Sequence, residues 1–237
     1  MSELDFSGKT VLVVGGSSGI GNGIAHGFLS RGAQVHAWGT RASADDYDAA
    51  NGSDLSGLHY SCVDVSDHAA IEAHQADFDT LDVLVLSQGV VRYRQEEFEK
   101  PGWDYVMDVN IDSVMSCASK FKPLLAETNG AIIIVSSISG MQANIGNPAY
   151  AASKAAAISL TKTLGQAWAR DGIRVNGLAP GLVPTKLTAV TTENEKRMQG
   201  ALRATAAPRR HTGGYGRGCV VSGLASGCLC AGPDHCR

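Results

Sequence analysis

A tyrosine and a lysine, Tyr150 and Lys154, lie four residues apart in a segment whose pattern predicts a helix. Side chains at this spacing share one face of a helix. A positive charge beside a phenol favours the phenolate, so the ammonium group can lower the phenol's pKa from ~10 toward the range of a general acid or base. Ser137 precedes this pair, and a glycine loop lies far upstream at 15–21. The combination indicates proton transfer coupled to a hydride carrier.

The elements that must position this pair follow from the apolar pattern of the chain. Apolar runs predict six strands, and the gaps between them contain helical patterns. The predicted strands are 10–14, 34–38, 58–63, 81–86, 131–135 and 174–178, and the predicted helices are near 20–29, 67–78, 96–126 and 149–170. Strands that are apolar throughout and alternate with helices are typical of a parallel sheet covered on both faces. We therefore expect an α/β doubly wound sheet, a Rossmann fold, in a single domain.

The glycine loop follows the first predicted strand and opens the first predicted helix. Gly15, Gly19 and Gly21 permit a tight turn and a close approach of the backbone to a pyrophosphate, whose charge the helix N-terminus stabilises. Ser17 and Ser18 add hydroxyl donors, and Ile20 lies among them. A simple strand-to-helix turn is the alternative, but the position of the loop favours dinucleotide binding.

The choice of cofactor depends on the residues about twenty positions past the glycines. An acidic side chain there would bind the ribose diol of NAD. This chain has Gly39, Thr40 and Arg41 instead. Without a carboxylate to repel a 2′-phosphate, and with an arginine able to pair with it, NADP(H) is favoured and NAD(H) is the alternative. Arg41 could also be an exposed loop cation.

These residues resemble the short-chain dehydrogenase/reductase family over about residues 7–203. The family's glycine loop is similar to Val14–Gly21, with Val14 in place of threonine. Further positions match family motifs in order and at fitting intervals. They are Asp64 and Val65, Gly89, Asn110, Ser137, Tyr150, Lys154, and Pro180, Gly181, Val183 and Thr185.

The resemblance implies a role for each match. Tyr150 would exchange the proton of a substrate oxygen that Ser137 positions, Lys154 would lower the phenol's pKa and hold the nicotinamide ribose, and Asn110 would fix a water. Asp64 would lie near the adenine, and Val183 and Thr185 would meet the carboxamide. The expected enzyme is an NAD(P)-dependent oxidoreductase that exchanges a hydride with a secondary alcohol or ketone. The alternatives are a sugar epimerase or dehydratase using the same tyrosine and lysine, a dinucleotide sensor, and an inactive gene product.

One motif departs from the family. The family's Asn-Asn-Ala-Gly after the fourth strand appears as Leu86-Ser87-Gln88-Gly89, which keeps only the glycine. The first asparagine normally ties neighbouring strands together, so its loss puts local stability in doubt.

Composition narrows the partners. The net charge is -3 and no basic stripe is present, which argues against nucleic acid. The absence of an apolar run of ~18 residues or a signal-peptide pattern predicts no membrane association and a cytoplasmic protein. A small-molecule substrate is expected, and the resemblance implies a homo-oligomer, a dimer or tetramer. Cys62 and Cys117 lie inside apolar segments and are expected to be buried free thiols.

The end of the chain, residues 204–237, does not fit the domain at 1–203. Its segment 213–219 has neither a helix nor a strand period, because four of its first six residues are glycine. Cys228, Cys230, His235 and Cys236 lack a standard zinc spacing, so no metal site is predicted. Codons for 211–237 can be chosen so that reading one nucleotide later gives an amphipathic helix and a strand. We therefore interpret 204–237 as a frameshifted tail, which would deprive the sheet of its last strand.

Overall fold

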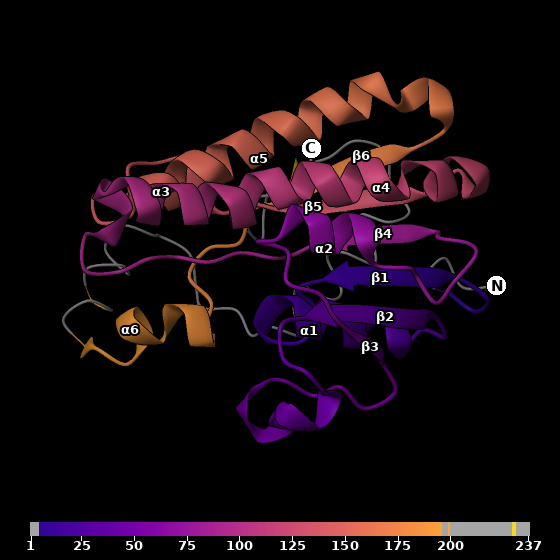
Figure 1. Ribbon diagram of the computed structural model, residues 1–237, viewed down its shortest axis with the longest axis horizontal. Helices are drawn as coiled ribbons and strands as arrows, with labels where there is room; N and C mark the ends of the chain where they lie inside the picture. The colour runs from indigo at the N-terminus through magenta and orange to yellow at the C-terminus, as the bar shows by residue number, and fades with distance from the viewer. Residues whose placement is uncertain (1–4, 196–198, 200–228, 231–237) are drawn as a thin grey trace.

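The computed structural model describes residues 5–195, residue 199 and residues 229–230. They form a parallel sheet in the order β3-β2-β1-β4-β5-β6-β7, which is the predicted doubly wound Rossmann arrangement (Figure 1). Its strands are β1 (Thr10–Val14), β2 (Gln34–Gly39), β3 (His59–Cys62), β4 (Val83–Leu86), β5 (Ala131–Val135), β6 (Arg174–Leu178) and β7 (Leu229–Cys230). The order reverses between β1 and β4, where ligands of such sheets bind.

Helices connect the strands. They are α1 (Gly19–Leu29), α2 (His68–Ala73), α3 (Lys100–Met107), α4 (Ser113–Thr128), α5 (Pro148–Ala167) and α6 (Ala189–Thr192). Short 3-10 turns lie at 44–46, 49–51, 96–98, 138–140, 169–171 and 186–188. The predicted helix 96–126 is wrong as a single element, because it is divided into a 3-10 turn, α3, a π-helical turn (Asp108–Asp112) and α4. The predicted helix 67–78 is also too long, since α2 ends at Ala73.

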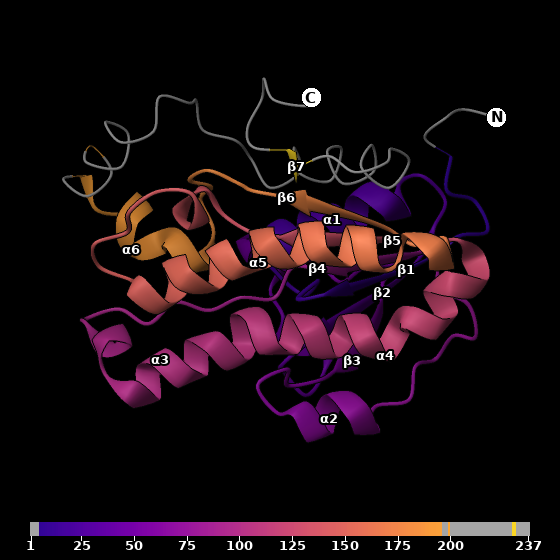
Figure 2. The same cartoon turned by 90° about the horizontal axis from the view of Figure 1, so that it is seen from above.

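Alternate residues of the central strands enter two separate cores. On one face, Leu12, Leu84 and Ile132 belong to a buried cluster with side chains from α2, α4 and α5. On the other face, Val11 and Val85 pack with residues of α1. Figure 2 shows α2, α4 and α5 lying in succession, with α1 behind the sheet. Both faces of the central strands are thus buried and shielded from water, which explains why these strands are apolar throughout.

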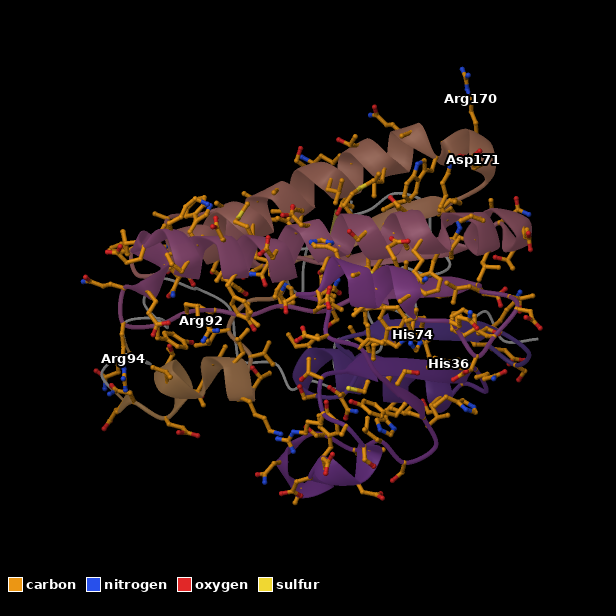
Figure 3. All side chains as sticks on the ribbon, in the orientation of Figure 1. His36, His74, Arg92, Arg94, Arg170 and Asp171 are labelled. Carbon is orange, nitrogen blue, oxygen red and sulfur yellow. The ribbon has the colours of Figure 1, made fainter. Side chains whose placement is uncertain are left out.

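The β2–β3 side of the sheet contains a group of aromatic rings. The His36 and His59 rings stack with centroids 4.7 Å apart, and His74 meets Trp38 edge-on at 4.9 Å (Figure 3). Burial, followed by the neighbouring His59, lowers the pKa of His36 to about 4. Burial also lowers the pKa of His74, so His36 and His74 are neutral at pH 7 and have structural roles in this part of the fold.

The last strand corrects one expectation. Leu229 and Cys230 pair in parallel with Gly177 and Leu178 of β6, so a two-residue strand extends this edge where the sequence predicted none. The boundary at residue 203, the frameshift interpretation and most of the residues weighed as a metal site lie outside the described residues. Cys62 and Cys117 are both free, as expected, but only Cys117 is buried; the expectation that Cys62 is buried is wrong, because it lies at the end of the edge strand β3 and is exposed. Within the ranges that the structure describes, no helix is both long and apolar enough to cross a membrane.

Candidate active site

A cavity of about 310 Å³ runs along the carboxyl ends of the strands from the glycine loop to Tyr150 and Lys154. It collects most of the residues that the sequence singled out. The predicted residues that line it are Gly15, Ser17, Ser18, Gly19, Ile20, Gly21, Gly39, Thr40, Val65, Gly89, Ser137, Tyr150, Lys154, Pro180, Gly181, Val183 and Thr185. Arg41, Asp64 and Asn110 do not line it.

The glycine loop forms one wall of the cavity. Gly15 follows β1 with φ of 76°, and a Cβ there would lie 2.8 Å from the backbone nitrogen of Gln88. Only glycine fits this turn, which brings the loop against the end of β4. Helix α1 begins at Gly19, its first residues line the cavity, and it has no acidic residue in its first turn, so the positive end of its dipole meets the cavity without a competing carboxylate. This wall suits a pyrophosphate.

The reactive side chains come from β5 and α5. Ser137 follows β5, and the first turn of α5 presents Tyr150. Burial raises the pKa of the Tyr150 phenol above its ordinary value, whereas hydrogen bonding with Ser137 works in the opposite direction, and Tyr93 and Glu97 add to the rise. The expectation that the phenol's pKa is lowered is therefore wrong for this structure. A phenol with a raised pKa is protonated at neutral pH and can donate its proton.

The positive charge of Lys154 does not bring the pKa of Tyr150 back down, because its amino group is directed to a backbone carbonyl and not to the phenol. Its Nζ donates to the Val135 carbonyl oxygen at 2.9 Å and lies 5.8 Å from the centroid of the Tyr150 ring. Burial lowers the pKa of Lys154 to about 8. The position that a Cβ on Gly89 would take is only 3.4 Å from this Nζ, so the glycine kept in the altered Leu86–Gly89 motif leaves room for the lysine.

Asn110 takes a structural position beside the cavity. Its Oδ1 accepts the Val90 amide at 2.7 Å, and its Nδ2 donates to the Val90 carbonyl at 3.0 Å and to Ser153 Oγ at 3.1 Å. The side chain is thus occupied in joining the π-helical turn to the segment after β4 and to α5. To fix a water, Asn110 would have to use a backbone atom, because both polar atoms of its side chain are occupied. Asn110 lies in the π-helical turn, where the backbone hydrogen-bonding pattern changes and can free a backbone group for this role.

Asp64 turns away from the cavity. Its Oδ1 accepts from the Ser66 amide at 2.9 Å and the Ser66 hydroxyl at 2.7 Å. Its predicted place near an adenine therefore stays a prediction. The altered motif contributes Gln88, whose Nε2 donates to Ser113 Oγ at 3.0 Å while its buried Oε1 has no hydrogen-bond partner.

The structure reveals a buried carboxylate that the sequence analysis missed. Glu97 is fully buried, and its Oε1 accepts from the Arg92 amide at 2.9 Å and from Asn147 Nδ2 at 3.1 Å. Its Oε2 accepts from the backbone N–H of Tyr150 at 2.9 Å. Glu97 therefore joins the segment after β4 to the first turn of α5. Its sequence neighbours Glu96 and Phe98 are exposed, so no local pattern marks it as buried.

A second cavity of about 280 Å³ adjoins the first at Ser137 and Tyr150. Its walls come from the segment after β4, the 138–147 segment and the residues around α6. The remaining lining residues are Val91, Tyr93, Ile138, Ser139, Gln142, Ala143, Asn144, Asn147, Gly181, Leu182, Leu187, Thr188 and Thr191. Tyr93 donates its hydroxyl to the Leu187 carbonyl oxygen at 2.7 Å, which connects two of these segments. Arg92 and Arg94, on either side of Tyr93, are labelled in Figure 3.

Lys186 is a second residue that the sequence analysis missed. It lines the first cavity beyond Thr185, and its Nζ donates to Ser53 Oγ at 3.0 Å. A cation at this place, opposite the glycine loop, adds to the positive potential that a phosphate would meet.

Comparisons with known proteins agree with this geometry. A family model described as short chain dehydrogenase matches residues 9–196. The chain is 36% identical over 199 residues to the 3-oxoacyl-[acyl-carrier-protein] reductase FabG of Chlamydia muridarum, with 79% of each chain covered. It is 34% identical over 206 residues to the 2-dehydro-3-deoxy-D-gluconate 5-dehydrogenase of Pseudoalteromonas atlantica, with 83% of this chain and 81% of the relative covered.

Solved structures give the same result. A gluconate 5-dehydrogenase from Burkholderia cenocepacia, in complex with NADP and tartrate, superposes with a TM-score of 0.81 at 27% identity, covering 94% of this chain and 90% of the other. The RhlG/NADP active-site complex of Pseudomonas aeruginosa superposes with a TM-score of 0.82 at 26% identity, covering 94% of this chain and 92% of the other.

Proposed function

Because the chain belongs to the short-chain dehydrogenase family, we propose that Tyr150, Ser137 and Lys154 carry out its reaction where the two cavities meet. The chain is an NAD(P)-dependent oxidoreductase that acts on a CH–OH or carbonyl group, and NADP(H) is its favoured cofactor. The observation that carries the proposal is the single cavity that connects the glycine loop with Tyr150 and Lys154.

The residues of the first cavity suit a dinucleotide. The N–H groups at the start of α1 and the hydroxyls of Ser17 and Ser18 would hold the pyrophosphate. Val183 and Thr185 would lie at the nicotinamide end, and Lys154 would reach the adjacent ribose. When bound, the nicotinamide would supply a hydride to a ketone or accept one from an alcohol.

Three side chains would manage the substrate oxygen. Tyr150 donates its phenolic proton as a ketone is reduced and takes a proton back when an alcohol is oxidised. Ser137, which already hydrogen-bonds Tyr150, orients the same oxygen. Lys154 bonds to the Val135 carbonyl oxygen in this structure, and its charge would stabilise the phenolate that develops only if Nζ turned from that carbonyl toward the phenol.

The second cavity would take the rest of the substrate. Its lining contains the amides of Gln142, Asn144 and Asn147 together with hydroxyls and aliphatic groups. These groups favour a small secondary alcohol or ketone that carries further hydrogen-bonding groups. An oxo sugar acid and a 3-oxoacyl thioester, which correspond to the relatives' names, are the first substrates to compare.

The test is a cofactor-oxidation screen. Purified protein is incubated with NADPH or NADH and with sugar acids, cyclic ketones and acyl ketones, and absorbance at the wavelength of the reduced nicotinamide is followed. We expect turnover of at least one ketone with NADPH. Tight NADPH binding without turnover of any carbonyl compound would favour a sensor, and absence of NADPH binding would contradict the proposal.

The limits and assembly of the domain belong to the same proposal. We infer that residues 1–203 form the catalytic domain and that 204–237 result from a frameshift. Resequencing the DNA tests this, and an intact frame whose codons cannot yield the alternative peptide contradicts it. We also expect a homo-oligomer and a cytoplasmic location. Light scattering after size-exclusion chromatography, on this chain and on its frame-restored version, measures the assembly.

A further inference from the structure

The loop after β2 contains a tyrosine whose hydroxyl is surrounded by hydrogen-bond donors. The backbone N–H groups of Thr40 and Arg41 both donate to the Tyr47 hydroxyl at 3.1 Å. Ser17, from the glycine loop, also hydrogen-bonds this hydroxyl. Donors from two segments that are far apart in the sequence thus converge on one oxygen atom.

The same oxygen lies beside the cofactor cavity. Ser17, Gly39 and Thr40 all line that cavity. A Cβ on Gly39 would lie 2.5 Å from both Ser17 Oγ and the Tyr47 hydroxyl oxygen, so these two hydroxyls occupy the space in front of the end of β2. The acidic side chain that binds the ribose diol of NAD at this position in dinucleotide-binding folds is absent, and the Tyr47 hydroxyl lies where it would begin.

A second phenol, that of Tyr60 on β3, adjoins this group. Tyr60 donates its hydroxyl hydrogen to the carbonyl oxygen of Arg41, which can only accept. Its hydroxyl oxygen also lies within hydrogen-bonding distance, 3.3 Å, of the Tyr47 hydroxyl. The oxygen of Tyr47 accepts from the two amides, in the way that an anion would.

The surroundings also favour negative charge at this point. Burial raises the pKa of the Tyr47 phenol, but hydrogen bonds with Ser17, Tyr60 and the amides of Arg41 and Thr40 together bring it below its ordinary value. Paired backbone N–H groups of this kind form anion-binding concavities in other proteins. Two of the loop's three acidic side chains accept from its own backbone, Asp46 from the Ser43 amide and Asp48 from the Ala50 amide.

Arg41 is held by the same residues. Its guanidinium lies over the Tyr47 ring, 4.8 Å from the centroid, and donates to the carbonyl oxygen of Asp46. The guanidinium that the sequence predicts as a partner of a 2′-phosphate thus packs on Tyr47, whose hydroxyl also accepts from the two amides. A phosphate that binds here would have to replace Tyr47 as the partner of both amides and of the guanidinium.

We propose that the Tyr47 hydroxyl occupies the place of the cofactor's 2′-phosphate and leaves it when the phosphate binds, which makes Tyr47 a specificity-determining residue for NADP(H) against NAD(H). The inference rests on the proposed function, since it assumes that a dinucleotide enters the first cavity. The hydroxyl keeps the two amides satisfied in the free protein, at the expense of affinity for the phosphate. Segment 41–50 is largely exposed and Tyr47 itself is half-buried, so the tyrosine can leave this place by giving up its contacts with Tyr60 and Arg41.

The test compares two nucleotides that differ only in the 2′-phosphate. Calorimetric titration of 2′,5′-ADP and 5′-AMP is carried out on the wild-type protein and on Tyr47→Phe. We expect Tyr47→Phe to bind 2′,5′-ADP about five- to tenfold more tightly, because the phosphate no longer displaces two hydrogen bonds. Binding of 5′-AMP should change by less than about twofold. Unchanged or weaker binding of 2′,5′-ADP by the variant overturns the proposal, the latter because Tyr47 would then be a ligand of the phosphate.

Tyr60→Phe is the matched control, since it removes a neighbouring phenol hydroxyl and leaves Tyr47 on both amides. It should change 2′,5′-ADP affinity less than Tyr47→Phe does. A measurement on the wild-type protein covers the case in which a variant fails to fold. The amide NMR signals of Thr40 and Arg41 should shift with 2′,5′-ADP and much less with 5′-AMP, and equal shifts overturn the proposal. If the wild-type protein binds 2′,5′-ADP as expected but oxidises NADPH with no carbonyl compound, the proposed function fails and this inference stands.

Discussion

The two ends of the cofactor cavity are built differently. At the catalytic end, Ser137 and Lys154 are buried, and each comes from or contacts a central element, β5 or α5. At the opposite end, Thr40, Arg41 and Tyr47 belong to a largely exposed segment whose polar groups bond to one another. The groups for proton transfer are therefore fixed by the core, while those proposed to select the cofactor are held by a surface segment.

The catalytic end also retains groups that are costly to bury. Lys154 is desolvated, and Tyr150 is kept protonated by burial. Such groups persist where chemistry needs them, because a packed apolar side chain would be more stable there. At the adenosine end, the polar groups of the segment form hydrogen bonds with one another, so the free-energy cost of burying polar groups is small there.

The largest expected effect is at the catalytic end. Replacing Tyr150 by phenylalanine removes the proton donor and leaves the ring, so kcat should fall by ~10²- to 10⁴-fold. NADPH binding, measured by the fluorescence of the reduced nicotinamide, should change little. Tyr105→Phe is the control, because Tyr105 lines neither cavity. Substantial activity in Tyr150→Phe would remove this residue from the mechanism.

The second prediction concerns the stability cost of Lys154. Its pKa is about 8 in the folded protein against an ordinary value of 10.5, so between these pH values the unfolded chain binds more protons than the folded one. Stability attributable to this group therefore rises with pH across that window. Relative to Lys154→Met, the wild-type free energy of unfolding should increase by up to about 3 kcal/mol from pH 8 to 10.5.

Urea unfolding at several pH values measures this difference. Lys162→Met, on the same helix but away from the cavity, is the control and should show no comparable trend. A difference between wild type and Lys154→Met that stays constant from pH 8 to 10.5 would mean that the lysine is not desolvated.

The third prediction tests how the catalytic end is held. A glutamine at Glu97 must place its NH₂ group against at least one of three N–H donors, so a buried hydrogen bond is lost. We expect Glu97→Gln to lower the free energy of unfolding by about 2 kcal/mol and kcat by about tenfold, with a smaller change in KM for NADPH. Glu96→Gln, at the exposed neighbouring position, should leave both quantities unchanged. Equal behaviour of the two variants would show that Glu97 does not position Tyr150.

The smallest effect is expected at the adenosine end. Arg41→Met removes the cation assigned to the 2′-phosphate, and KM for NADPH should rise about tenfold while KM for NADH and kcat change little. Arg170→Met is the control, because Arg170 projects from the opposite end of the molecule (Figure 3). An equal loss with both cofactors would mean that Arg41 only stabilises the segment.

Several features of this protein were determined by its sequence alone. The apolar runs predict β1, β4 and β5 closely, because a strand buried on both faces must be apolar throughout. Most of the motif positions from Gly15 to Thr185 line one cavity, since they follow strand ends or open helices at the same edge of the sheet, whereas Arg41, Asp64 and Asn110 do not line it. The break in the predicted helix 96–126 could not be predicted from the spacing of its apolar residues, because the π-helical turn keeps that spacing. The turn is held instead by a contact with another segment, the hydrogen bond from the Val90 amide to Asn110.

Tertiary structure alone decided how these residues behave. Burial, a property of the whole fold, keeps the Tyr150 phenol protonated and draws the pKa of Lys154 down, whereas their spacing predicted a lowered phenol pKa. Glu97 meets Tyr150 across 53 positions of the chain, and Tyr47 meets Ser17 across the ends of two strands. Sequence pattern records local period and residue type, but contacts between distant segments and the loss of water around them exist only once the sheet has formed.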